Sequence, residues 1–219
     1  TNPGSGAPAC AAHARQIGEI IYLWNKLQGD LFWIFFGLTR AKKADWFAEY
    51  ETAMSIWHSI QSDKTQKEMV AGVARWRLAP RLRSHVLWLC RAHEKLSPYR
   101  NAFAHVGFHY HWETNAYIPY DLGARKSALE RLAAYPKREL FRKLRGDLAA
   151  LSDYASSLGS RIHYPEPAPL VHRPKDLAYY SFQRPLRNRR KLLVQRTPKG
   201  ANALPRHLLS DFTCRPVAA

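Results

Sequence analysis

The sequence has few cysteines and no stretch that resembles a secretion signal. Its three cysteines, Cys10, Cys90 and Cys214, are far apart and form no CxxC pair. A disulfide framework and a cysteine-ligated zinc site are therefore not expected, and we predict a reducing, cytoplasmic compartment. The first ten residues also lack the basic start and apolar run of a signal peptide.

No apolar stretch is free enough of polar residues to cross a membrane. The most apolar segment, residues 17–38, contains side chains that would be costly at bilayer depth, namely Glu19, Asn25, Lys26, Gln28 and Asp30. We therefore expect a helix buried within a protein and no membrane partner.

Acidic residues are scarce. The 219 residues include 17 Asp and Glu against 34 Lys and Arg, which gives a formal net charge of +17. Such an excess favours a polyanionic partner such as nucleic acid, or an anionic membrane surface. Hydrophobic residues make up 46% of the chain, close to the value for globular proteins, so most of it should fold.

Helical periodicity dominates the first three quarters of the chain. In residues 11–38 the apolar positions recur every three or four residues, as on one face of a buried helix. These positions are Ile17, Ile20, Trp24, Leu27, Leu31, Ile34 and Leu38. Similar patterns predict helices over 42–60, 64–78, from Pro80 into residues 100–105, and over 136–158, with possible short strands in 108–119.

These segments predict an all-α fold, an antiparallel bundle of four to five helices. Ser97-Pro98 should interrupt the fourth helix and restart it as a short one. Most of the tryptophans fall on apolar positions and are expected in the core, Trp76 among them.

Composition divides the chain into three parts. Residues 1–10 hold two prolines and two glycines and are expected to be flexible. Residues 11–158 form the helical bundle. Residues 159–219 carry 12 basic against three acidic residues and eight of the 14 prolines, which predicts an extended or disordered basic tail.

One hexapeptide, residues 100–105, combines a permanent cation, an amide and an imidazole: Arg100, Asn101 and His105. On a helix Asn101 and His105 share a face, whereas Arg100 and His105 diverge by roughly 140°. Two copies facing each other across a two-fold axis could bring each histidine near the partner's arginine. Such a pair suits RNA cleavage, in which the imidazole moves protons and the guanidinium holds the phosphate. No metal is required, because the substrate supplies its own 2′-hydroxyl nucleophile.

The hexapeptide resembles the R-x4-6-H signature of the HEPN superfamily. The Ile20-x3-Trp24-Asn25-x-Leu27 run and residues 57–69 are similar to small bacterial HEPN-like proteins, and the resemblance covers about residues 11–158. It implies a homodimeric helical bundle. It also implies a metal-independent endoribonuclease without a cofactor, which leaves a 2′,3′-cyclic phosphate and acts as a toxin or defence RNase, with an antitoxin or partner protein.

Carried over to this chain, the resemblance makes Arg100 the phosphate-binding residue, Asn101 the orienting residue and His105 the acid and base. Some superfamily members only bind RNA, a nucleotide or a partner protein, and the same three residues could instead stabilise the bundle. His105, His109, His111 and Glu113 have a spacing that could bind zinc, but histidines clustered beside a loop are common and we predict no metal site.

The densest basic run lies in the tail. It could follow phosphates without reading sequence, or contact an acidic partner. We favour nucleic acid, since positive charge pervades the rest of the chain. The residues of this run are Arg184, Arg187, Arg189, Arg190 and Lys191.

Overall fold

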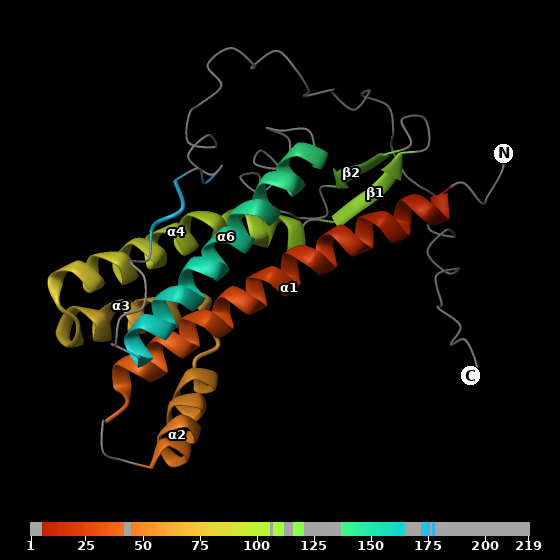
Figure 1. Ribbon diagram of the computed structural model, residues 1–219. Helices are drawn as coiled ribbons and strands as arrows, with labels where there is room; N and C mark the ends of the chain where they lie inside the picture. Colours follow the sequence, from red (N-terminus) through yellow and green to blue (C-terminus); the bar gives the residue numbers. More distant parts are fainter. Residues whose placement is uncertain are drawn as a thin grey trace. The chain divides into compact units, whose positions relative to one another are not determined.

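A computed structural model describes residues 6–41, 45–105, 107–111, 116–120, 137–164, 172–175 and 177 (Figure 1). All of them belong to the first of two units into which the chain divides, residues 1–184. The elements in chain order are α1 (Gly6–Thr39), α2 (Trp46–Ser59), α3 (Asp63–Arg77), α4 (Pro80–His105), β1 (Gly107–His111), β2 (Ala116–Tyr120) and α6 (Lys137–His163). The described part is thus predominantly α-helical, as predicted, with one short hairpin.

Helix α1 supplies the largest share of the core. Its predicted stripe is confirmed from Ile20 to Leu38, where every member is at most 3% exposed. On α6 the predicted leucines, from Leu140 to Leu158, are fully buried. Each large apolar side chain buried in this way favours folding by about 1.5–3 kcal/mol. One shared hydrophobic cluster therefore joins α1 and α6 with α2, α3 and α4.

The main helix pair of the fold is parallel, which corrects the antiparallel arrangement that we predicted for the bundle. Glu19 of α1 lies 2.8 Å from Arg145 of α6, and Lys26 lies 3.5 Å from Asp153. The partners advance together along both helices, so α1 and α6 run in the same direction. Figure 1 shows the two helices side by side over much of their length.

The hairpin explains how the chain returns to the start of α1. Strands β1 and β2 pair antiparallel, with Gly107 opposite Tyr120. The Phe108 ring lies 4.6 Å from His13 on α1 and 6.5 Å from Phe103 on α4. Helix α4 therefore ends beside the beginning of α1, and α6 begins at the same end of the bundle. The short strands predicted in 108–119 are confirmed by this hairpin.

Two helices are longer than predicted. Helix α1 begins at Gly6 rather than Ala11, which includes Pro8. Proline is tolerated in a first turn because the N–H groups there have no acceptor within the helix. Helix α6 continues through Gly159 to His163, so the change in composition at residue 159 is not a structural boundary.

Helix α4 is continuous from Pro80 to His105, so the predicted interruption at Pro98 is wrong. Proline removes one helix hydrogen bond and normally breaks or kinks a helix. Here the residues on both sides of it are held in the core, since Leu96, Ala102 and Phe103 are at most 1% exposed. Tertiary packing therefore overrides the local signal.

The prediction for Trp76 is also wrong. Trp24 and Trp57 are buried as predicted, whereas Trp76 near the end of α3 is 90% exposed and Trp46 is 44% exposed. The buried face of α3 carries Val70, Ala71 and Ala74, and Trp76, two residues after Ala74, lies roughly 200° away from that face.

The first part of the predicted tail lies against the helices. Leu177 is 3% exposed. The Arg173 guanidinium donates to the Ser84 carbonyl at 3.1 Å and lies 5.7 Å above the Trp88 ring. The remainder of the tail lies outside the described residues.

Close packing of α1 on α6 requires glycine at two points. A Cβ on Gly159 would lie 2.7 Å from the Trp33 ring, and one on Gly37 would lie 2.7 Å from His163 Nε2. The His163 ring stacks on Trp33 with centroids 4.0 Å apart and its Nε2 is 2.9 Å from the Trp33 carbonyl oxygen.

We predict that Gly159→Ala lowers the free energy of unfolding by about 1–2 kcal/mol, because overpacking outweighs the gain in helix propensity. Gly146→Ala is the matched control on the same helix, where a Cβ meets no atom within 4 Å. It should instead raise stability by about 0.5–1 kcal/mol. Chemical denaturation of both variants measures the difference, and equal changes would refute the close contact.

Candidate functional site

The hexapeptide forms the end of α4, and its three polar residues differ in exposure. The side chain of Arg100 is 19% exposed and points between α1 and α3, whereas Asn101 and His105 are exposed. His105 is the last residue of α4, directly before the hairpin.

Arg100 is held by two other helices. Its Nη2 lies 3.4 Å from Asp63 Oδ2 at the start of α3, and its Cζ lies 4.9 Å above the Trp24 ring of α1. Trp24 in turn donates its indole N–H to the same Asp63 oxygen at 3.0 Å. The Arg100 Nε is buried without a hydrogen-bond partner among the described residues. The guanidinium therefore joins three helices within one chain.

A buried histidine extends this contact into the core. His93, about two helical turns before Arg100 on α4, is 2% exposed, and its ring centroid is 4.2 Å from that of Trp24. The side-chain nitrogen of Gln28 lies 3.0 Å from His93 Nε2. Since an amide nitrogen can only donate, Nε2 accepts and the imidazole is neutral. Burial, with smaller effects of Lys67 and Arg100, lowers the pKa of His93 to about 3.

On the other side of His93, Lys67 on α3 is 6% exposed and pairs with Glu94 on α4 at 3.0 Å. The Cys90 thiol donates to the Lys67 carbonyl at 3.8 Å, and burial raises its pKa to about 12. This cysteine is therefore an uncharged, buried thiol and a poor nucleophile. Between α1, α3 and α4 lies a row of polar side chains, each of which contacts a polar or charged partner on another helix.

Asn101, which the resemblance makes the orienting residue, contacts Arg100 in the structure. The Asn101 Oδ1 accepts from Arg100 Nη1 at 2.8 Å, although the two residues are adjacent in sequence. The amide oxygen is thereby directed toward the guanidinium rather than the imidazole.

Several other predicted positions lie outside the described residues. The side chains of His109 and His111, together with Glu113, lie outside the described residues, as does the basic run 184–191. Within the described part of the chain, no three potential metal ligands gather at one point.

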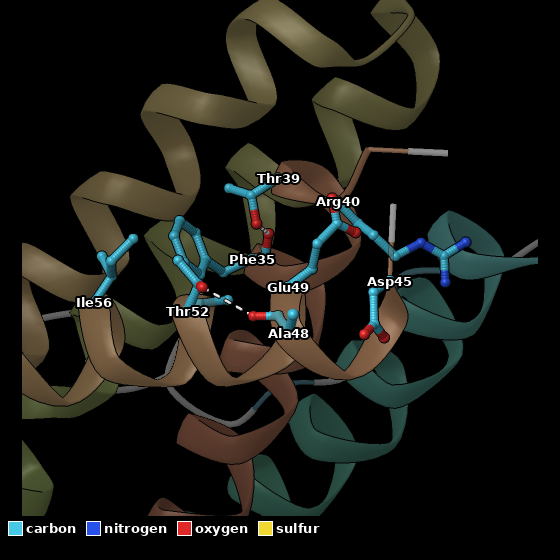
Figure 2. A pocket seen from close by; sticks show the side chains of 9 residues that line it. Phe35, Thr39, Arg40, Asp45, Ala48, Glu49, Thr52 and Ile56 are labelled. Atoms are coloured by element: carbon cyan, nitrogen blue, oxygen red, sulfur yellow. Dashed lines mark hydrogen bonds between the residues drawn. The ribbon is translucent and has the colours of Figure 1, made fainter. Parts of the chain in front are cut away.

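A hollow of about 300 Å³ opens between the end of α1 and α2 (Figure 2). The Thr52 and Thr39 hydroxyls that line it donate to the carbonyls of Ala48 and Phe35 at 2.8 and 3.0 Å. Both hydroxyls are therefore hydrogen-bonded within their own helices. Its lining shares no residue with the hexapeptide or its contacts. The hollow is therefore separate from the candidate site.

Sequence reasoning identified Arg100 and His105 but missed the residues that surround Arg100. Asp63 is the first residue of α3, directly after the capping residue Ser62. Nothing in the sequence connects it with Trp24, 39 positions earlier, or with Arg100, 37 positions later. The one usable signal is a polar residue at the spacing of apolar ones, at Gln28 four residues after Trp24 and at His93 four residues after Leu89, because such residues need partners.

Comparisons with protein-family models, with curated proteins and with solved structures gave no match for this chain. The HEPN resemblance accordingly rests on the hexapeptide and the helical pattern. Across the described helices, none has the length and apolarity that crossing a membrane requires.

We predict that Asp63→Asn lowers the free energy of unfolding by about 2 kcal/mol, because Arg100 would lose the charge that balances its partial burial. The matched control is Glu68→Gln on the same helix, which breaks the exposed pair with Lys64. That loss should stay below about 0.5 kcal/mol. Urea denaturation of both variants tests this, and equal losses would show that the Arg100 contact contributes little.

The neutral His93 predicts a pH dependence of stability. Its pKa is about 3 in the fold against 6.5 for a free histidine, so below pH 6.5 only the unfolded chain gains the proton. This contribution is complete above pH 6.5 and is lost, by up to about 1.4 kcal/mol per pH unit, as the pH falls toward the folded pKa.

His93→Gln should therefore flatten the fall in unfolding free energy between about pH 6.5 and 4. His58→Gln, at an exposed position on α2, should leave the slope unchanged. The measurement is urea denaturation at several pH values. Parallel curves for wild type and His93→Gln would contradict the buried neutral state.

Proposed function

We propose that the chain is a metal-independent endoribonuclease of the HEPN type that works as a homodimer. The observation that carries the proposal is the exposed His105 at the end of α4, five residues after an arginine that is fixed in place by Asp63 and Trp24. The positive net charge of +17 supports a polyanionic substrate such as RNA.

In this proposal His105 takes the proton from a ribose 2′-hydroxyl, whose oxygen then attacks the adjacent phosphorus. The bond to the 5′-oxygen breaks, and that oxygen receives a proton from the His105 imidazole of the second copy. The products are a 2′,3′-cyclic phosphate and a free 5′-hydroxyl. Acid–base catalysis of this kind contributes about 10²–10⁴-fold to the rate.

A second copy is part of the proposal for a geometric reason. On one helix, residues five apart diverge by roughly 140°, and here Arg100 faces α1 and α3 while His105 is exposed. Two copies meeting across a two-fold axis near the ends of α4 would bring two imidazoles to one phosphate. A toxin or defence RNase, with an antitoxin as partner, belongs to the same proposal.

The second candidate is a non-catalytic module that binds RNA, a nucleotide or a partner protein. The Arg100–Asp63 pair favours this alternative. A guanidinium that already contacts a carboxylate and Asn101 stabilises the fold and is not free to bind a phosphate. Under this alternative RNA binding survives His105→Ala, and no product carries a cyclic phosphate.

We expect the purified full chain to cleave mixed RNA in EDTA and to leave 2′,3′-cyclic phosphate ends. His105→Ala should reduce the rate at least about 100-fold without lowering the melting temperature, since this side chain is exposed. His58→Ala, another exposed histidine, is the control and should cleave like the wild type. Equal cleavage by His105→Ala and wild type would exclude the catalytic proposal.

Two further variants separate a catalytic from a structural Arg100. Asp63→Asn keeps the guanidinium but removes its carboxylate partner, whereas Arg100→Ala removes the guanidinium. If Arg100 acts on phosphate, Arg100→Ala loses cleavage and Asp63→Asn keeps it at a temperature where both are folded. If both variants lose cleavage in proportion to their loss of stability, the role of Arg100 is purely structural.

A further inference from the structure

The corner where α3 passes into α4 is basic and, among the described residues, carries the most exposed large apolar side chain. Trp76 is 90% exposed in the last turn of α3. From Met69 to His93 the sequence contains five arginines and no acidic residue. An indole with nearly all of its surface in water is available to contact a ligand, and tryptophan is enriched at interfaces.

Two arginines of the corner donate hydrogen bonds to main-chain carbonyls. Arg77 donates to the carbonyl of Leu38 at 3.0 Å, and Arg83 donates to the carbonyl of Arg75 at 3.1 Å. Arg75 and Arg81 are exposed. None of these four is in an ion pair within the described part of the chain, so their charges are uncompensated there.

Acidic groups near the corner are already paired. The hollow of about 270 Å³ between α3 and α4 is lined by Arg75 and Arg91 and by two carboxylates, Glu68 and Glu94. Glu68 pairs with Lys64 at 3.8 Å and Glu94 with Lys67 at 3.0 Å. The positive field also reaches His85, whose pKa is lowered by burial and then by Arg173, Arg81 and His172.

We propose that this corner, defined by Arg75, Trp76, Arg77, Arg81 and Arg83, binds single-stranded RNA. An exposed indole offers a flat face on which an unpaired base can stack, and arginines around it can hold the phosphates on either side. A duplex does not fit this chemistry, because its bases are already stacked on one another. The choice of RNA over DNA rests on the proposed function.

The corner lies far from the hexapeptide. Arg81 and His105 are 24 residues apart on the continuous α4, which corresponds to roughly 36 Å. Figure 1 shows the α3–α4 turn at the opposite end of α4 from the hairpin. The corner therefore holds a segment of RNA distinct from any at His105, and it increases affinity without taking part in cleavage.

Binding is tested with the full chain carrying His105→Ala, in EDTA, so that the RNA stays intact whether or not the wild type cleaves it. The probe is a short fluorescein-labelled oligouridylate, followed by fluorescence anisotropy. Trp76→Ala should weaken binding about ten-fold, while Trp76→Phe should retain most of the affinity because a ring remains for stacking. Arg81→Glu should weaken binding and reduce its salt dependence.

Matched controls are Phe47→Ala, an exposed aromatic residue on α2, and Arg142→Glu, an exposed arginine on α6. Both should bind like the parent. Ultraviolet crosslinking followed by mass spectrometry should place bound RNA on the peptide that contains Trp76, whatever the basic tail adds to affinity.

Crosslinks confined to other peptides, or a loss for Trp76→Ala no larger than for Phe47→Ala, would overturn the proposal. The proposal would also be overturned if a duplex bound as tightly as the oligouridylate and Trp76→Ala did not weaken that binding. If oligodeoxythymidylate bound as tightly as the oligouridylate, the preference for RNA would be excluded. These outcomes are independent of cleavage, since binding is measured without His105. If the protein bound the oligouridylate but did not cleave RNA, only the proposed nuclease activity would be excluded.

Discussion

Burial of one face of α1 is the interaction on which the other elements depend. The stripe from Ile20 to Leu38 is almost completely removed from water, and α2, α3, α4 and α6 each contact this helix. Two glycines permit α6 to approach closely enough for the Trp33 and His163 rings to stack. Because α1 touches all the others, a change in its apolar face would affect every contact that positions the end of α4.

The polar row between α1, α3 and α4 has a different role. Burying Arg100, His93 and Lys67 removes them from water, which is favourable only because each finds a partner. The partners lie on different helices, so the row fixes how these helices are aligned along one another. It also positions the hexapeptide, since the guanidinium of Arg100 is held while His105 remains accessible.

The two candidate surfaces lie at opposite ends of α4 and differ in chemistry. At one end His105 offers an imidazole for proton transfer, and at the other Trp76 and its arginines offer stacking and charge. Helix α4 is continuous through Pro98, so the separation between the two ends is fixed by one rigid element. A substrate that reached both would have to be extended and flexible, as single-stranded RNA is.

Local pattern in the sequence determined the helical class, the buried faces of α1 and α6, and the residues of the hexapeptide, because apolar spacing and side-chain chemistry are properties of short segments. Tertiary structure alone decided that α1 and α6 are parallel, that α4 continues through Pro98, and that Trp76 is exposed. It also decided that Arg100 pairs with Asp63 and stands over Trp24. The contacts of the parallel helix pair and of Arg100 join residues 37 to 127 positions apart in sequence, and their energies exist only after the helices have packed.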